Sequence, residues 1–137
     1  MKNLIFLSSV KSYYTDLTLF VFRIVIGASL MTHGYGKLIR LIDGNIWSRT
    51  HLFFNEEISL ALVAFAEFFC PIFVALGFWT RLFTLPIIYA FIIIVFDVHI
   101  DDPFSKMEKG ILFLFSYILI FFIGPGKLSV DNLISNK

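Results

Sequence analysis

Glu67 is the residue whose place in the sequence points most directly to chemistry. It is the only charged residue in an apolar stretch over about residues 58–79, and it lies near the middle of that stretch. A carboxylate at that depth must be protonated or paired with a cation. His33 lies at a similar depth in an earlier apolar stretch, over about residues 17–39, and Lys37 follows four residues later on the same helix face. The sequence therefore predicts a polar cluster that joins the first two helices through His33 and Glu67.

Each residue type in this cluster suggests a distinct role. His33 and Glu67 are the candidate catalytic residues: His33 exchanges a proton, and Glu67 sets the charge state of the imidazole. Either Lys37 or Arg23 supplies the neighbouring positive charge and stabilises an anion. Ionisable side chains are costly inside a bilayer, and this cost makes them candidates for function. A ligand site built from them is expected to open toward the loops that follow the first and third helices.

The same residues also have a purely structural interpretation. Lys37 and His99 lie close enough to the ends of their apolar stretches to reach the membrane interface by snorkelling. Arg23 can serve as an anchor beneath the chain termini. Glu67 and His33 can form a buried ion pair that has no part in catalysis. The sequence leaves both interpretations open.

The elements that position these residues are apolar helices. The chain has 137 residues, of which 58% are hydrophobic and 15% charged, and its mean hydropathy is +0.87. Ordinary soluble domains have about 45–50% apolar and about 25% charged residues, so this composition indicates an integral membrane protein. A spanning helix needs about 20 mainly apolar residues. The sequence predicts one domain over residues 1–137 with four spans, at about residues 17–39, 58–79, 82–98 and 110–124.

The expected fold class is all-α, an integral membrane antiparallel four-helix bundle. The turn over residues 79–81 is so short that the second and third helices must be antiparallel neighbours. Four crossings place this turn and both termini on one side of the bilayer, and the loops 40–57 and 100–109 on the other. Basic residues are divided equally between the two sides, and only Arg23 favours cytoplasmic termini.

Composition also excludes several partners and cofactors. A net charge of +1 argues against a nucleic-acid partner. The single cysteine, Cys70, rules out an intramolecular disulfide and a redox pair of thiols. The three histidines, His33, His51 and His99, lack the spacing of metal ligands, so no metal site is predicted. Because His33 and His99 lie at different depths, they are also unsuited to bind a haem between them.

Several short motifs follow one another in a fixed order. The first helix carries Arg23, Gly27 and the run His33-Gly34-x-x-Lys37-Leu38. The later motifs are Glu67, Pro71, Leu76-Gly77, Thr80-Arg81, His99, Asp102-Pro103-Phe104, Glu108 and Gly124-Pro125-Gly126-Lys127-x-Ser129-x-Asp131. Together they resemble the DoxX family of small membrane proteins, and the resemblance extends from Arg23 to Asp131.

The resemblance implies a four-helix protein of the bacterial plasma membrane with a link to redox chemistry. Proteins of this kind include a thiosulfate:quinone oxidoreductase subunit and a component of a membrane-associated oxidoreductase complex. A quinone is therefore the cofactor that the resemblance implies. Carried over by position, the ligand-binding residues of the family are Arg23, His33, Lys37, Glu67, Arg81 and His99.

Three functions remain for such a protein. The first is a small redox-linked subunit that binds a quinone or another apolar ligand beside Glu67 and His33 and works with a soluble redox partner protein. The second is a non-catalytic membrane scaffold or assembly factor that recruits a soluble partner through its polar loops. The third, a small transporter, requires a homo-oligomer to enclose a path through the bilayer.

Overall fold

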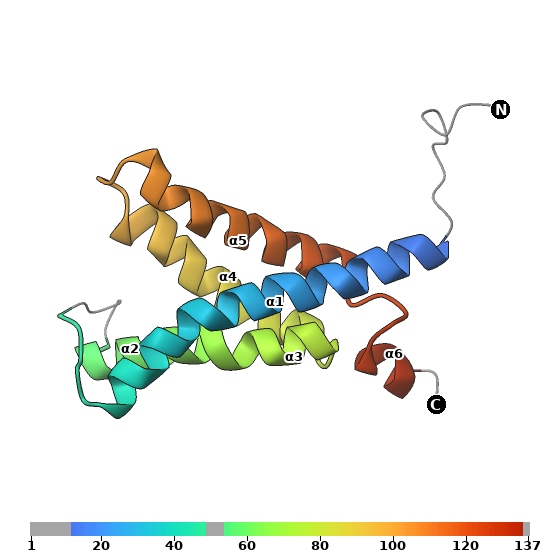
Figure 1. The fold of residues 1–137 in the computed structure, drawn as a ribbon, viewed down its shortest axis with the longest axis horizontal. Helices are drawn as coiled ribbons and strands as arrows, with labels where there is room; N and C mark the ends of the chain where they lie inside the picture. The colour runs from blue at the N-terminus through green and yellow to red at the C-terminus, as the bar shows by residue number, and fades with distance from the viewer. Residues whose placement is uncertain (1–11, 49–53, 136–137) are drawn as a thin grey trace.

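Helices account for the regular structure of the chain. The computed structural model describes residues 12–48 and 54–135. Its helices are α1 (Ser12–Ile42), α2 (Glu56–Ala64), η2 (Phe65–Phe69), α3 (Cys70–Leu76), α4 (Thr80–Ile93), η3 (Ile94–Val98), α5 (Phe104–Ile123) and α6 (Val130–Ser135) (Figure 1). The segments α2, η2 and α3 form one continuous rod, and α4 continues directly into η3. The described residues contain no strand, so the predicted all-α class is confirmed.

The outer surface of these helices is apolar. The segments Tyr13–Ile42, Glu56–Leu76 and Thr80–Val98 are each long and apolar enough to cross a membrane. Large side chains such as Phe96 and Phe122 lie exposed on the outside, where a soluble protein would place polar residues. Among the described residues, three helices are therefore suited to cross a bilayer, as expected for a multi-pass membrane protein.

The predicted helices are present, but most of them begin earlier than predicted. The first begins at Ser12 rather than near residue 17, and the fourth begins at Phe104 rather than near residue 110. The second begins at Glu56 because the side chain of Asn55 caps it, accepting a 2.8 Å hydrogen bond from the Ile58 N–H. Polar residues in a first helical turn resemble a loop when hydropathy alone is considered, so the hydropathy pattern places these helix starts too late.

The long helices pack side by side around one core. Figure 1 shows α1 running along the α2–η2–α3 rod in the opposite direction, and α4 and α5 forming a second antiparallel pair. Contacts of α3 with α4 join the two pairs. Leu30 of α1, Val74 of α3, Ile87 of α4 and Tyr117 of α5 are fully buried at the centre. This core fixes the positions of the helices that carry the ionisable residues.

Glycines let α1 approach the η2–α3 segment closely. A Cβ atom added at Gly34 would lie 2.4 Å from the carbonyl carbon of Glu67, and one at Gly27 would lie 3.1 Å from the carbonyl oxygen of Pro71. The two glycines are seven residues apart and therefore face the same side of α1. The sequence predicts a close helix crossing from this spacing, and the structure confirms it. The backbone that carries Glu67 is thus fixed against α1.

Glu67 itself lies within a short π-helix. Pro71 has no N–H group to donate to the carbonyl of Glu67, four residues earlier, so the α-helical hydrogen-bond pattern is interrupted here. The turn widens instead, and the Cys70 N–H bonds to the carbonyl of Phe65, five residues earlier. Single π-helical turns of this kind occur frequently at functional sites. The widened turn gives Glu67 a position on the rod that a regular helix would not give it.

Candidate functional site

An ion pair joins α1 to η2 at the predicted cluster. The Lys37 Nζ donates a hydrogen bond to the Glu67 Oε1. The Glu67 side chain is only 1% exposed, whereas that of Lys37 is 25% exposed. The ring of Trp47 lies beside the ammonium group, with its centroid 6.0 Å from the Lys37 Nζ. Of the two cations proposed from the sequence, Lys37 is therefore the charge neighbour of Glu67.

The second oxygen of Glu67 has no partner in the described part of the chain. Its Oε2 is buried and accepts no hydrogen bond there. A buried acceptor without a donor is unfavourable by about 1–3 kcal/mol, and by more when the group is charged. The carboxylate is thus held by one oxygen and offers the other to a hydrogen-bond donor.

Glu67 and Lys37 line a cavity of about 220 Å³, which we call the central cavity. Its walls come from α1, η2, α4, η3, the turn after η3 and the first half of α5. The lining residues are His33, Lys37, Glu67, Phe91, Ile94, His99, Lys106, Lys109, Gly110 and Phe113. Four of the six residues proposed as ligand-binding therefore meet here: His33, Lys37, Glu67 and His99.

Two further cations line the central cavity that the sequence does not identify as site residues. Lys106 and Lys109 lie in the first turns of α5, which the sequence assigns to a loop. The spacing Lys106, Lys109, Gly110, Phe113 is i, i+3, i+4, i+7, which places all four on one helix face. That periodicity is the signal that identifies them once the helix is known to begin at Phe104.

His33 contributes to the cavity without contacting Glu67 directly. The described structure contains no hydrogen bond between these two residues, so the buried ion pair of the structural interpretation is not formed there, although both residues line the same cavity. The His33 ring instead packs edge-on against Phe113, with 5.6 Å between the ring centroids. The cause is the register of α1, because Lys37 lies one turn further along and reaches the carboxylate first.

His99 is held at the cavity by the turn that joins η3 to α5. Its Nδ1 lies 2.6 Å from the Asp102 Oδ2, and the Lys106 Nζ donates a 2.9 Å hydrogen bond to the Asp102 Oδ1. These hydrogen bonds, first that of His99 and then that of Lys106, lower the pKa of Asp102. Asp102 therefore stays ionised to lower pH than a free aspartate and orients both basic residues.

A second space, the outer cavity, continues from the central cavity toward the end of α1. It measures about 320 Å³ and is lined by Lys37, Arg40, Trp47, Val63, Ile94, Val98 and His99. Lys37, Ile94 and His99 line both cavities, so the two spaces adjoin. The outer cavity lies at the end of the molecule that carries the loops after α1 and η3, which is where the sequence predicts the opening.

Arg23 and Arg81 lie at the opposite end of the bundle and do not reach the central cavity. Arg23 is fully buried, and its guanidinium donates to the carbonyl of Val74 at 3.2 Å and to that of Leu128 at 2.5 Å. Arg81 is exposed beside Gly124, at the end of α5. Arg23 therefore ties α1 to the C-terminal segment, in agreement with its structural interpretation.

Asp131 completes this attachment of the C-terminal segment. Its carboxylate accepts hydrogen bonds from the N–H groups of Trp79 at 2.7 Å and Thr80 at 3.0 Å, and from the Thr80 hydroxyl at 2.8 Å. Its own N–H donates to the carbonyl of Gly77 at 2.8 Å. Asp131 thus caps α4 from a distant part of the sequence. The terminal motif that ends in Asp131 holds the fold together.

Replacing Asp131 by alanine is expected to destabilise the protein without altering the cavity. Removal of an N-terminal cap costs about 0.5–2 kcal/mol, and the Thr80 hydroxyl also loses its acceptor. Thermal unfolding of the purified protein in mild detergent measures the loss. Asp131→Asn keeps one carbonyl acceptor and should recover part of the stability. An alanine variant as stable as the parent would show that the attachment contributes nothing.

Comparison with known proteins agrees with this arrangement. The family model named DoxX matches residues 18–100, which is more than half of the chain. The matched part runs from α1 to the turn after η3 and contains His33, Lys37, Glu67 and His99. No curated protein and no solved structure matches the chain. The match to the family model is sufficient, and the chain belongs to the DoxX family.

Proposed function

We propose that the protein crosses the bacterial plasma membrane four times as an antiparallel bundle, with α5 as the fourth span and both termini in the cytoplasm. At 1.5 Å per residue, the 20 residues of α5 extend over about 30 Å, the thickness of a bilayer core. The charges near its start are compatible with a span because Lys106 and Lys109 line the central cavity, and long lysine side chains at a helix end can reach the membrane interface.

Cysteine labelling tests the fourth crossing. We expect Ser48→Cys and Asp101→Cys to react with a membrane-impermeant maleimide in intact cells, and Ser135→Cys to react only after lysis. All three positions are exposed, and the native Cys70 is buried, so it does not interfere. If α5 does not cross, Asp101→Cys and Ser135→Cys will behave alike, and the four-span topology is then wrong.

For function, we propose a small redox-linked membrane subunit that binds a quinone in the central cavity. The observation that supports it most is the state of Glu67, which is fully buried beside a cavity and has one oxygen paired with Lys37 and one without a donor among the described residues. The reduced form of a quinone, a hydroquinone, carries ring hydroxyl groups, and one of them would donate a hydrogen bond to that oxygen. The aromatic and aliphatic lining from Phe91, Ile94 and Phe113 suits the faces of such a ring.

The residues of the cavity have separate roles in this proposal. A bound quinone supplies two-electron redox chemistry coupled to the uptake of two protons. His33 and His99 hold and exchange protons at the cavity wall through their ring nitrogens. Lys37 and Lys109 offset negative charge in the cavity, and Glu67 orients the ring by its free oxygen. Electrons come from a soluble redox partner that docks on the loop end of the bundle.

A fluorescence titration tests the site. The chain has two tryptophans, of which Trp47 lines the outer cavity and Trp79 lies at the other end. In a Trp79→Phe background, a decyl-tailed benzohydroquinone, kept reduced, is expected to change the fluorescence of Trp47 on binding. Glu67→Gln and His33→Ala should each raise the Kd about tenfold or more while the protein still folds.

Glu57→Gln is the matched control, because Glu57 is an exposed carboxylate in the first turn of α2. It should bind as the parent does. Equal affinity in the parent, Glu67→Gln and His33→Ala would contradict the quinone site. The non-catalytic scaffold would then be the better explanation of the family's polar residues.

A further inference from the structure

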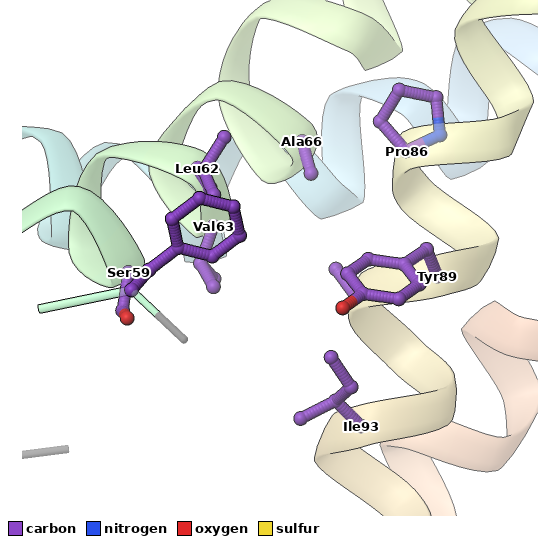
Figure 2. Close-up of a pocket in the computed structure, with 9 residues that line it drawn as sticks. Ser59, Leu62, Val63, Ala66, Pro86, Tyr89 and Ile93 are labelled. Carbon is purple, nitrogen blue, oxygen red and sulfur yellow. The ribbon is translucent and has the colours of Figure 1, made fainter. Parts of the chain in front are cut away.

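A narrow apolar groove lies between α2–η2 and α4, outside the polar cavities. Figure 2 shows Leu62, Val63 and Ala66 on one helix and Tyr89 and Ile93 on the other, facing each other across an open space. The groove holds a cavity of about 40 Å³. The complete lining is Phe54, Ser59, Leu62, Val63, Ala66, Pro86, Tyr89, Ala90 and Ile93. None of these residues carries a charge.

The groove adjoins the polar cavities. Val63 lines both the groove and the outer cavity, and the outer cavity shares Lys37 and His99 with the central cavity. Ile93, the last residue of α4, lines the groove, and Ile94, the first residue of η3, lines both polar cavities. The three spaces are therefore neighbours, and Val63 lies between the outer cavity and the apolar groove on the side of the bundle.

Small side chains give the groove its depth. Ala66 and Ala90 are buried at its floor, at 2% and 5% exposure, and within the described part of the chain no larger residue fills the space above them. The outer edges are Leu62 and Tyr89, which are 46% and 48% exposed on the surface that faces lipid. A space of about 40 Å³ with this apolar lining suits a section of a hydrocarbon chain and is too small for a ring.

We infer that the ligand of the central cavity is an amphiphile, and that its hydrocarbon tail lies in the groove between α2–η2 and α4. This inference rests on the proposed function, because the proposed function places the polar ring in the central cavity. The tail leaves the ring through the outer cavity, passes Val63 and reaches lipid between Leu62 and Tyr89. The site therefore selects membrane-dissolved ligands with a long tail over water-soluble ones that have the same ring.

The test compares two probes on groove variants in the Trp79→Phe background. The probes are a decyl-tailed benzohydroquinone and the same benzohydroquinone without the tail, each kept reduced and titrated through the fluorescence of Trp47. Ala66→Leu fills the groove from its floor. Ala28→Leu is the matched control, because Ala28 lies exposed at a different surface hollow on α1. Partitioning of the tailed probe into micelles is the same for every variant and does not affect the comparison.

The parent and Ala28→Leu are expected to bind the tailed probe at least tenfold more tightly than the tail-less one. In Ala66→Leu this preference should fall to threefold or less, with unchanged affinity for the tail-less probe. Leu62→Phe, at a half-exposed position, narrows the groove without touching the core and should lower the preference in the same direction. It provides the same test if Ala66→Leu does not fold.

A tail preference that Ala66→Leu and Leu62→Phe both retain would overturn the inference. The groove would then hold bilayer lipid and not the ligand's tail, and the proposed quinone site would stand. If the parent binds neither probe, the proposed function fails and this inference fails with it. Loss of tail-less binding in the groove variants would also contradict the inference. The inference places the ring outside the groove, so a change in the groove should not affect a probe that has no tail.

Discussion

Lys37→Met is expected to destabilise the folded protein by about 3–5 kcal/mol, because it leaves the buried carboxylate of Glu67 without its cation. Glu67 is 1% exposed, and its other oxygen already lacks a donor among the described residues. Removal of Lys37 therefore leaves both oxygens unpaired. The free energy of unfolding, measured by titration with a denaturing detergent in mixed micelles, reports the loss.

The double variant Lys37→Met with Glu67→Gln distinguishes the effect of an unpaired buried charge from the effect of losing the whole ion pair. Removing both charges avoids the unpaired buried charge, so the double variant is expected to be more stable than Lys37→Met alone. Arg40→Met is the matched control, since Arg40 is an exposed cation one turn along α1. Changes below about 0.5 kcal/mol in Lys37→Met, of the size typical for surface substitutions, would contradict a buried ion pair.

Gly34→Ala is expected to produce the second large effect. The new Cβ atom would lie 2.4 Å and 2.5 Å from the carbonyl carbon and oxygen of Glu67, and 2.6 Å from the amide nitrogen of Phe68. These are backbone atoms of a packed rod, so α1 must move away as a whole. Overpacking of this kind costs about 1–3 kcal/mol. The shift also moves Lys37 away from Glu67, so ligand affinity should fall with stability.

Gly36 provides the control, because a Cβ atom added there meets nothing within 4 Å. Gly36→Ala removes a flexible residue from the middle of a helix and should raise stability by about 0.5–1 kcal/mol. The two variants carry the same chemical change two residues apart on α1. Equal stability of Gly34→Ala and Gly36→Ala in the same unfolding titration would show that the close crossing is not required.

The sequence predicts the helices well, and it also predicts that Glu67 needs a partner. Composition identifies the membrane, and the position of Glu67 within its apolar stretch is sufficient to identify it as a residue that needs a partner. The close crossing at Gly27 and Gly34 also follows from their spacing alone. These features depend on local periodicity and on the cost of placing a charge in lipid, and both are readable from a single sequence.

The pairing of residues across helices is less predictable. Arg23 and His33 both lie among apolar residues in the sequence, so their neighbours do not distinguish their roles. The sequence alone does not show that Arg23 faces the carbonyls of Val74 and Leu128 at the opposite end of the bundle. Lys37 and not His33 reaches Glu67 because of the rotation of α1, which depends on the whole crossing. The sequence places Lys106 in a loop because α5 begins at Phe104, several residues before its continuous apolar run.

The π-helical turn at Glu67 also cannot be predicted from the sequence. Pro71 predicts a disturbance in the second helix, but a kink and a π-helical turn are both compatible with a missing N–H. The observed turn, Phe65–Phe69, leaves the rod continuous. Tertiary packing of Gly34 against the same backbone selects between the two outcomes, and this packing involves a helix more than 30 residues away.

Native mass spectrometry of the protein purified in mild detergent tests the central claim most directly. The claim is that the central cavity binds a quinone in its reduced, hydroquinone form, whose hydroxyl donates to the second oxygen of Glu67. The parent protein is expected to retain an adduct with the mass of a quinone, and Glu67→Gln is expected to fold but lose it. A parent spectrum without such an adduct, or an adduct retained equally by Glu67→Gln, would contradict the claim.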